Sequence, residues 1–226
     1  YSFSHALIRE TLYEELSTTR RVRLHRQIGE VLEGLYAANP EPHLAALAYH
    51  FSEGAQGGDV DKAIDYTTRA GERATSLTAY EDAASHYERA LQALELKEPP
   101  DEEQRCELLL ALGEAQNKAG DRDRAKETFR QAADLSRKLG TADCLARAAL
   151  GFAGWWGEWG TVDERTVGLL EEALQALGEE DSPLRAALLS RLAMELYFSG
   201  SPEPAEEPSR KSVEMARRVG DPKALA

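Results

Sequence analysis

The sequence predicts an all-α protein made of antiparallel helix pairs, and three observations support this prediction. Apolar residues recur at spacings of three and four along most of the 226-residue chain, as in amphipathic helices, and no alternating strand pattern persists. Short breaks rich in Gly, Pro, Asp and Ser separate these segments. A set of small residues recurs at spacings of 42, 38 and 42 residues, which indicates an internal repeat.

Each predicted helix begins and ends at a recognisable signal. A side-chain oxygen just before a helix accepts a hydrogen bond from one of its unpaired first amides. The expected N-caps are Asp59, Thr78, Asp121 and either Asp181 or Ser182. Pro208 is expected to interrupt any helix that begins at Pro202, so the last helix is predicted to begin later. The predicted helices span residues 6–16, 18–37, 43–54, 60–76, 80–95, 102–119, 122–139, 142–158, 163–177, 183–199 and 206–219.

The repeating positions are small residues on the first helix of each pair, which we call the anchors. The anchors are Gly71, Gly113, Gly151 and Ala193. Second helices carry small residues of their own, namely Ala83, Ala90, Ala125 and Ala132. Small residues let two antiparallel backbones approach closely, and we expect Tyr87 or Phe129 to fill the space beside them.

Residues 113–132, GEAQNKAGDRDRAKETFRQA, resemble the tetratricopeptide repeat (TPR), whose signature is Leu-Gly followed by Ala-x3-Phe-x2-Ala. The spacing exceeds the roughly 34 residues of that repeat and its terminal Pro is missing, which longer helices would explain. HEAT-like pairs of about 40–47 residues are the competing interpretation. The resemblance implies a right-handed superhelical array of antiparallel helix pairs, a TPR-like α-solenoid. Its repeats are expected at about 58–98, 102–140, 142–178 and 183–220.

Composition argues against several kinds of partner. The chain has 27 basic and 40 acidic residues, a net charge of −13, and residues 1–40 contribute none of it because they hold five Arg and five Glu. An acidic surface does not suit a phosphate backbone, so we expect no direct nucleic-acid binding. No apolar run approaches the roughly 18–20 residues of a transmembrane helix, so no membrane partner is expected. Cys106 and Cys144 are interpreted as small buried side chains rather than a redox pair, in a cytoplasmic protein.

Residues 1–57 do not follow the repeat pattern and form a separate helical junction segment. The residues that carry a second resemblance are Phe3, His5, Ile8, Arg9, Tyr13, Leu16, Arg20 or Arg21, Leu24 and His25, together with the segments 44–55 and 63–91. They resemble the region that follows the ATPase and winged-helix parts of large bacterial signal-transducing ATPases of the STAND type. That class includes LuxR-type transcriptional regulators and relatives fused to cyclases or kinases.

This second resemblance implies that ATP is a cofactor only of an upstream ATPase domain. The chain itself has no G-x4-G-K-[ST] loop to hold phosphates. Because its only methionines are Met194 and Met215, we expect it to be a piece of a longer protein.

No set of residues suits catalysis or metal binding. His43 and His50 are seven residues apart, whereas zinc-binding histidines on a helix are usually three or four apart. Asp59, Asp61 and Asp65 lack the glycine and the further oxygen ligand of a calcium loop. We therefore expect a chain that is not an enzyme and holds no cofactor.

The strongest candidate for a binding site is the tryptophan cluster GWWGEWG at 154–160. The TPR resemblance implies that residues one, four and five positions after each anchor face a concave groove, and these positions become aromatic along the chain. Packing of the tryptophans in the core is the competing interpretation. The predicted partner-binding residues are Asn117, Lys118, Phe152, Trp155, Trp156, Met194, Tyr197 and Phe198.

We therefore expect a sensor module that binds a protein, a peptide or a small effector and reports to the ATPase of a transcriptional regulator. One alternative is an assembly scaffold that binds a fixed partner or its own kind. Another is the helical part of a multidomain cyclase or kinase. Residues 220–226, GDPKALA, resemble the start of a further first helix. The array is therefore expected to be cut here, and self-association through that end is an expected consequence.

Overall fold

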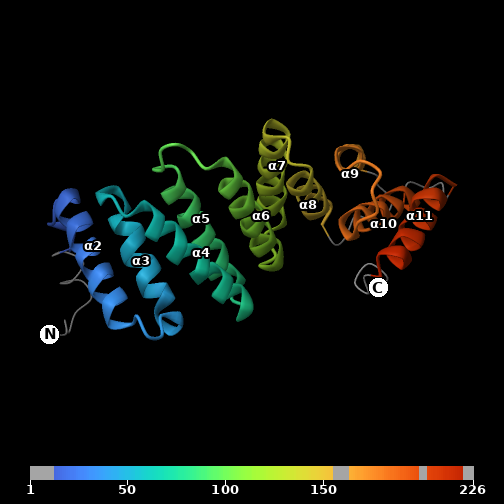
Figure 1. Ribbon diagram of the computed structural model, residues 1–226. Coiled ribbons are helices and arrows are strands. Elements are labelled where there is room, and N and C mark those ends of the chain that lie inside the picture. Colours follow the sequence, from blue (N-terminus) through green and yellow to red (C-terminus); the bar gives the residue numbers. More distant parts are fainter. Residues whose placement is uncertain (1–12, 155–162, 199–202, 221–226) are drawn as a thin grey trace. The chain divides into compact units, whose positions relative to one another are not determined.

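A computed structural model describes residues 13–154, 163–198 and 203–220, and in these ranges the chain forms helices and turns without a strand (Figure 1). The α-helices are α2 (Thr18–Leu35), α3 (Leu44–Gly54), α4 (Val60–Ser76), α5 (Tyr80–Leu94), α6 (Glu102–Lys118), α7 (Arg122–Leu139), α8 (Ala142–Ala153), α9 (Glu164–Ala176), α10 (Pro183–Tyr197) and α11 (Glu203–Val219). Two short 3-10 helices, η1 (Glu41–His43) and η2 (Ala55–Gly57), flank α3. The all-α prediction is confirmed. Most of the first predicted helix, 6–16, lies outside the described residues.

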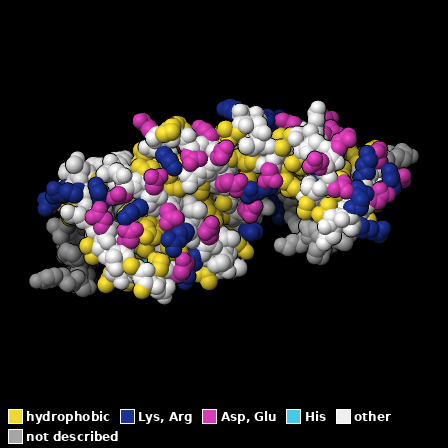
Figure 2. All heavy atoms as spheres, viewed as in Figure 1, with side chains coloured by type: hydrophobic (Ala, Val, Ile, Leu, Met, Phe, Trp, Pro, Cys, Tyr) yellow, Lys and Arg dark blue, Asp and Glu magenta, His cyan; other side chains and the backbone are white. Residues whose placement is uncertain are grey.

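Contacts divide the chain into two units, residues 1–101 and 102–226. In the first unit α2, α3, α4 and α5 each pack against the next helix along the chain. The expected junction segment and the first expected repeat therefore lie in one unit. In the second unit consecutive helices also pack together, and α8 contacts both α6 and α10. On the face shown in Figure 2, Asp and Glu side chains lie among Lys and Arg side chains.

The three glycine anchors meet the aromatic side chains that the sequence predicts, Tyr87 and Phe129. A Cβ built on Gly71 of α4 would lie 2.7 Å from the ring of Tyr87, which belongs to α5. A Cβ on Gly113 of α6 would lie 2.8 Å from Phe129 of α7, and one on Gly151 of α8 would lie closer still to the same ring. One buried phenylalanine therefore occupies the space that side chains on two neighbouring helices would need.

Polar contacts between helices hold the first unit. Glu33 of α2 accepts hydrogen bonds from Lys62 Nζ at 2.6 Å and from the Tyr66 hydroxyl at 2.9 Å, both on α4. Burial and the Glu33 carboxylate raise the pKa of Tyr66 to about 12, so this hydroxyl stays a donor throughout the neutral range. The Tyr13 hydroxyl lies 3.0 Å from His25 Nε2, and His25 Nδ1 lies 3.1 Å from His50 Nδ1. The junction residues thus form a hydrogen-bonded chain from Tyr13 through α2 to α3.

The expectation that Cys106 and Cys144 are unpaired is wrong. Both are buried, as expected, but they form a disulfide between α6 and α8. The two cysteines occupy equivalent positions 38 residues apart, and α6 and α8 pack side by side. Equivalent positions on neighbouring helices are brought together by the packing, and this is how the two cysteines meet.

Helix α11 also differs from the prediction, because it begins at Glu203 and continues through Pro208. Pro208 lies in the second turn, so it removes one amide hydrogen bond close to the end where helix amides are unpaired in any case. Among the predicted caps, Asp121 and Ser182 accept hydrogen bonds from the amides of Arg124 and Arg185. Ser182, and not Asp181, is therefore the N-cap of α10, since the Asp181 carboxylate pairs with Arg218.

Thr78 was predicted to cap α5, but Ala79 is the residue at that position. Thr78 has a φ of 60°, the left-handed conformation in which a chain often leaves a helix, and it follows the end of α4. No helix among the described residues is long and apolar enough to cross a membrane.

We predict that Gly151→Ala lowers the free energy of unfolding by about 1–3 kcal/mol, because the new methyl group would overlap the Phe129 ring. Gly168→Ala is the matched control. It lies inside α9 with no atom within 4 Å of its Cβ position, so it should stabilise the helix by up to about 1 kcal/mol. Urea unfolding followed by circular dichroism measures both. Equal effects of the two substitutions would contradict the packing described for Phe129.

We also predict that the protein loses stability as the pH falls from 7 to 5. Burial lowers the pKa of His25 and of His50; Glu53 opposes this at both, while Arg21 lowers the pKa of His25 further. Their pKa values in the unfolded chain are about 6.5, so below that pH the unfolded chain binds more protons than the folded one.

The His25→Gln variant should therefore show a shallower dependence of unfolding free energy on pH, measured by urea unfolding at several pH values. Some dependence should remain, because burial also lowers the pKa of His86. An unchanged slope in His25→Gln would show that His25 is not a source of the pH dependence of stability.

Candidate functional site

Six of the eight predicted groove residues lie among the described residues of the second unit, on α6, on α8 and at the end of α10. Asn117 is half-buried and Lys118 is exposed, both in the last turn of α6. Phe152, on α8, is half-buried, and Lys126 Nζ lies 5.8 Å from the centre of its ring. Trp155 and Trp156 lie outside the described residues.

The remaining three predicted residues come together at the end of α10. Met194 is 46% exposed and Tyr197 is 61% exposed, while Phe198, the C-cap of α10, is half-buried. The rings of Tyr197 and Phe198 meet edge to face, with centroids 5.4 Å apart. These three side chains line one hollow, which Asn117, Lys118 and Phe152 do not reach.

This hollow lies between α10 and α11, has a volume of about 520 Å³, and will be called the α10–α11 hollow. Its lining residues are Ser190, Ala193, Met194, Tyr197, Phe198, Ala205, Glu206, Ser209, Ser212 and Val213. Val213 is 42% exposed, so an apolar side chain from α11 faces the same space as Met194 and Tyr197 from α10. Its walls therefore combine apolar surface with serine hydroxyls.

Glu206 is the one charged residue that lines the α10–α11 hollow. Its carboxylate is exposed and has no ion pair with any side chain of the described ranges. Neighbouring charges of α11 are already paired, since Lys211 lies 2.6 Å from Glu207 and Arg210 lies 3.1 Å from Glu214. The hollow therefore offers a negative charge that a cationic ligand group could neutralise.

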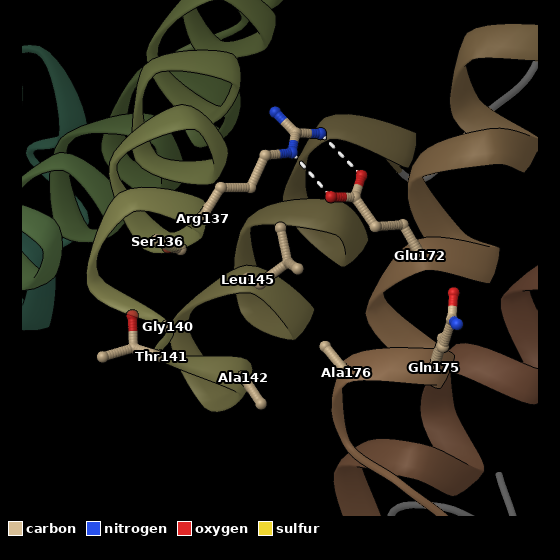
Figure 3. Close-up of a pocket in the computed structure, with 9 residues that line it drawn as sticks. All are labelled: Ser136, Arg137, Gly140, Thr141, Ala142, Leu145, Glu172, Gln175 and Ala176. Carbon is tan, nitrogen blue, oxygen red and sulfur yellow. Dashed lines mark hydrogen bonds and ion pairs between the residues drawn. The ribbon is translucent and has the colours of Figure 1, made fainter.

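A second hollow, of about 500 Å³, lies where α7, α8 and α9 meet (Figure 3). Arg137 of α7 donates two hydrogen bonds of 2.7 Å to the carboxylate of Glu172 on α9, at one side of this hollow. This contact lowers the pKa of Glu172 and raises that of Arg137. The two charges neutralise each other. The pair therefore joins α9 to α7 and leaves little free charge for a ligand to bind.

The helix expected to carry the tryptophans ends earlier than predicted. α8 stops at Ala153, and Gly154 follows with a φ of 66°. Arg191 of α10 donates a hydrogen bond of 2.7 Å to the carbonyl of Ala153 and another to the carbonyl of Gly154. The same guanidinium pairs with Glu195, with Nε 3.0 Å from the carboxylate. A cation at these last carbonyls is favourable, because they carry the negative end of the helix dipole.

Sequence reasoning missed this buried pair. Arg191 and Glu195 are 9% and 7% exposed, although both are charged. The available signal was their spacing of four residues within the segment 188–196, in which Ser190 is the only other polar residue. Among the described residues no group of three or more His, Cys, Asp or Glu side chains could hold a metal ion.

No protein-family model and no curated protein matches the chain. Among solved structures it is similar to BtubC (BKLC) from P. vanneervenii, with a TM-score of 0.60 and 18% sequence identity over 93% of this chain and 80% of that one. At this identity the likeness supports the helical fold alone.

Arg191→Met should destabilise the protein by about 3–5 kcal/mol, because Glu195 would remain buried without its partner and the end of α8 would lose its donors. The control is Arg147→Met, which removes an exposed pair with Glu107 and should cost less than about 1 kcal/mol. Urea unfolding measures both. Similar losses of unfolding free energy in the two variants would show that Arg191 does not compensate the buried charge of Glu195.

Proposed function

We propose that this chain is a non-catalytic binding module, built as a right-handed TPR-like array, that recognises a protein or peptide segment at the α10–α11 hollow. Its parent would be a signal-transducing ATPase of the LuxR-type regulator class, acting in the cytoplasm. In this proposal the module holds no cofactor, and ATP belongs to the expected upstream domain. The disulfide between Cys106 and Cys144 is the one observation that weighs against the cytoplasm.

The exposed apolar side chains around the α10–α11 hollow carry the proposal. Met194, Tyr197 and Val213 face one concave space instead of being scattered singly. Apolar groups that gather on a surface in this way usually mark interaction sites. Tyrosine suits such a site because it covers a large area with few rotatable bonds and keeps a polar end. In the proposal Asn117, Lys118 and Phe152 add contacts on the helices before α10.

Charge narrows the kind of segment that would bind. The hollow presents the unpaired carboxylate of Glu206, and the whole chain carries a net charge of −13. A segment with an apolar side chain next to Lys or Arg would fill the hollow and neutralise this carboxylate. Electrostatic attraction to the acidic chain would also speed its association.

The same exposed surface favours one second function, a scaffold that associates with its own kind. Two copies could cover each other's apolar side chains at this end of the chain. Sedimentation velocity over a range of protein concentrations separates the two functions. A monomer at all concentrations supports the binding module, whereas a dimer that Tyr197→Ala disrupts supports the scaffold.

Peptides selected from a displayed library of random 12-residue sequences should bind through Tyr197. We expect Tyr197→Ala to weaken the selected peptides at least tenfold in fluorescence anisotropy, because interface aromatics often dominate binding energy. Leu77→Ala is the control. Leu77 is 63% exposed, close to the 61% of Tyr197, but lies in the first unit, so its loss should change binding less than twofold. Equal binding to both variants, or no enriched peptide, would refute the proposed site.

A further inference from the structure

The disulfide between Cys106 and Cys144 lies one side chain away from the hollow between α7, α8 and α9. Ser136 of α7 lines that hollow (Figure 3), and its hydroxyl oxygen lies 3.3 Å from Cys106 Sγ. Leu145, the residue after Cys144, lines the same hollow. With a volume of about 500 Å³, the hollow falls within the range of small-molecule sites, roughly 300–1,000 Å³. A small molecule in the hollow therefore approaches Cys106 from the side of Ser136.

The surroundings of Cys106 suit a reduced thiol as well as a disulfide. The Ser136 hydroxyl donates its hydrogen to the carbonyl of Ala132 at 2.7 Å, which leaves its oxygen free to accept a hydrogen bond. The Ala132 carbonyl itself lies 3.8 Å from Cys106 Sγ. A sulfur in a disulfide carries no hydrogen, so it cannot donate to either group. The site therefore holds two acceptors for a hydrogen that only reduced Cys106 carries.

Cys144 lies in the first turn of α8, where a thiolate is favoured. α8 begins at Ala142, and the unpaired amides of a first helical turn carry partial positive charge. The side chain of the N-cap Thr141 accepts no amide hydrogen bond, in contrast to that of Asp121 at the start of α7. Asp143 brings a negative charge nearby, but its side chain is exposed and is screened by water and salt. Because thiols at helix N-termini ionise readily, Cys144 is the better leaving group of the two.

A reversible disulfide also agrees with a cytoplasmic location. Disulfides are rare in reducing compartments, and those found there are usually transient, catalytic or redox-sensing. This step rests on the proposed function, which assigns the chain to the cytoplasm. The 226 residues contain two cysteines only, so within this chain each can pair with no cysteine but the other.

We infer that Cys106 and Cys144 form a redox-sensing site that exchanges with a small thiol of the glutathione type, which enters through the hollow between α7, α8 and α9. A glutathione thiolate attacks Cys106 Sγ, the S–S bond breaks, and its electron pair leaves on Cys144 as a thiolate. A second glutathione thiolate attacks the glutathione sulfur of the mixed disulfide, which releases glutathione disulfide and Cys106 as a thiolate that takes up a proton. Two glutathione thiols are thus oxidised as one protein disulfide is reduced, and glutathione disulfide reverses both steps.

The exchange acts on α8, because reduction releases one end of this helix while the other end stays held. The carbonyl of Ala153 keeps its hydrogen bond from Arg191 of α10, and Gly151 keeps its contact with Phe129. The covalent link to α6 at Cys144 is the contact that reduction removes. The first turns of α8 therefore open more easily in the reduced protein, in a helix that contacts both α6 and α10.

The first test measures whether the disulfide responds to glutathione in the folded protein. The full chain is equilibrated without denaturant in buffers of increasing ratio of reduced to oxidised glutathione, quenched with acid and alkylated, and alkylated cysteines are counted by mass spectrometry. Both cysteines should be alkylated after the most reducing buffer and neither after the most oxidising one. A disulfide that persists until urea is added would be a structural link and would overturn the inference. Peptide binding through Tyr197 would be unaffected by that result, so the proposed site stands or falls separately.

Trapping the mixed disulfide tests the order of the steps. Iodoacetamide added early in the reduction should alkylate Cys144, and glutathione should be found on the proteolytic peptide that contains Cys106. Glutathione on the peptide that contains Cys144 would overturn the assigned route.

Ser136→Ala removes an acceptor for reduced Cys106 and should lower the equilibrium constant for reduction by glutathione about fivefold. Ser52→Ala is the matched control, because the Ser52 hydroxyl donates to the carbonyl four residues earlier, as Ser136 does, but lies in α3 of the first unit. Its equilibrium constant should change less than twofold. Equal effects of the two substitutions would contradict the role of Ser136.

Ala176→Trp tests the entry route, since Ala176 is exposed on α9 and lines the hollow. The larger side chain should slow reduction by glutathione at least tenfold and leave the equilibrium constant unchanged. The control is Ala46→Trp, at an exposed position of α3, which should leave the rate within twofold. Equal rates in the two variants would overturn entry through the hollow.

Hydrogen exchange tests whether the redox state reaches α8. Amides in the first turns of α8 should exchange at least tenfold faster in the reduced protein, whereas amides of α4 should exchange at the same rate in both states. Cys144→Ser should show the fast exchange in reducing and oxidising buffers alike. Equal exchange of α8 in the two redox states would overturn the sensing role.

Discussion

The packing of the second unit depends on the contact between Phe129 and two glycines. The ring lies where the Cβ atoms of residues 113 and 151 would be, so α6 and α8 can both approach α7 closely. A buried aromatic ring gains much of its stabilisation from many small contacts, and these require neighbours without side chains of their own. The disulfide between Cys106 and Cys144 joins the same two helices about two turns before the glycines. Steric fit and a covalent link therefore both hold α6 and α8 together.

The first unit uses the same steric device between Gly71 and Tyr87, and partly buried polar contacts join others of its helices. The pair of His25 and His50 needs at least one uncharged ring nitrogen to accept a hydrogen bond, so it is compatible with burial only while the rings are largely neutral. The Arg191–Glu195 pair of the second unit is different, since it is charged and buried and ends α8 through the backbone carbonyls. Apolar fit sets how closely helices lie, and these polar groups add directionality to particular contacts.

Helix pairs of one design can carry different residue types at equivalent positions. The backbone positions that hold Phe129 and Lys126 in α7 hold Ser209 and Glu206 in α11. Large apolar side chains at such positions require a permanent cover, because leaving them in water is unfavourable. Serines and a carboxylate there can remain in contact with water, and the neighbouring Tyr197 is 61% exposed.

The sequence by itself determined the helices, the anchors and the aromatic residues beside them. These follow from apolar periodicity and small-residue spacing, which are local properties of the chain. It also placed Met194, Tyr197 and Phe198 on one helix end, where the structure brings them together at the hollow. Asp121 was predicted as a cap and accepts an amide hydrogen bond from its own helix, whereas Asp59 precedes α4 without such a bond and pairs with Arg26 instead.

Only the tertiary structure decided where α8 ends, which cysteines pair and where the chain leaves a hollow. α8 ends at Ala153 with donors from Arg191, a residue 38 positions away in the sequence. Asn117 was predicted to share one site with Tyr197, yet the hollow at Tyr197 does not include it. Each of these outcomes depends on which helix lies beside which. That arrangement is set by the fit between distant side chains, and no local pattern of residues encodes it.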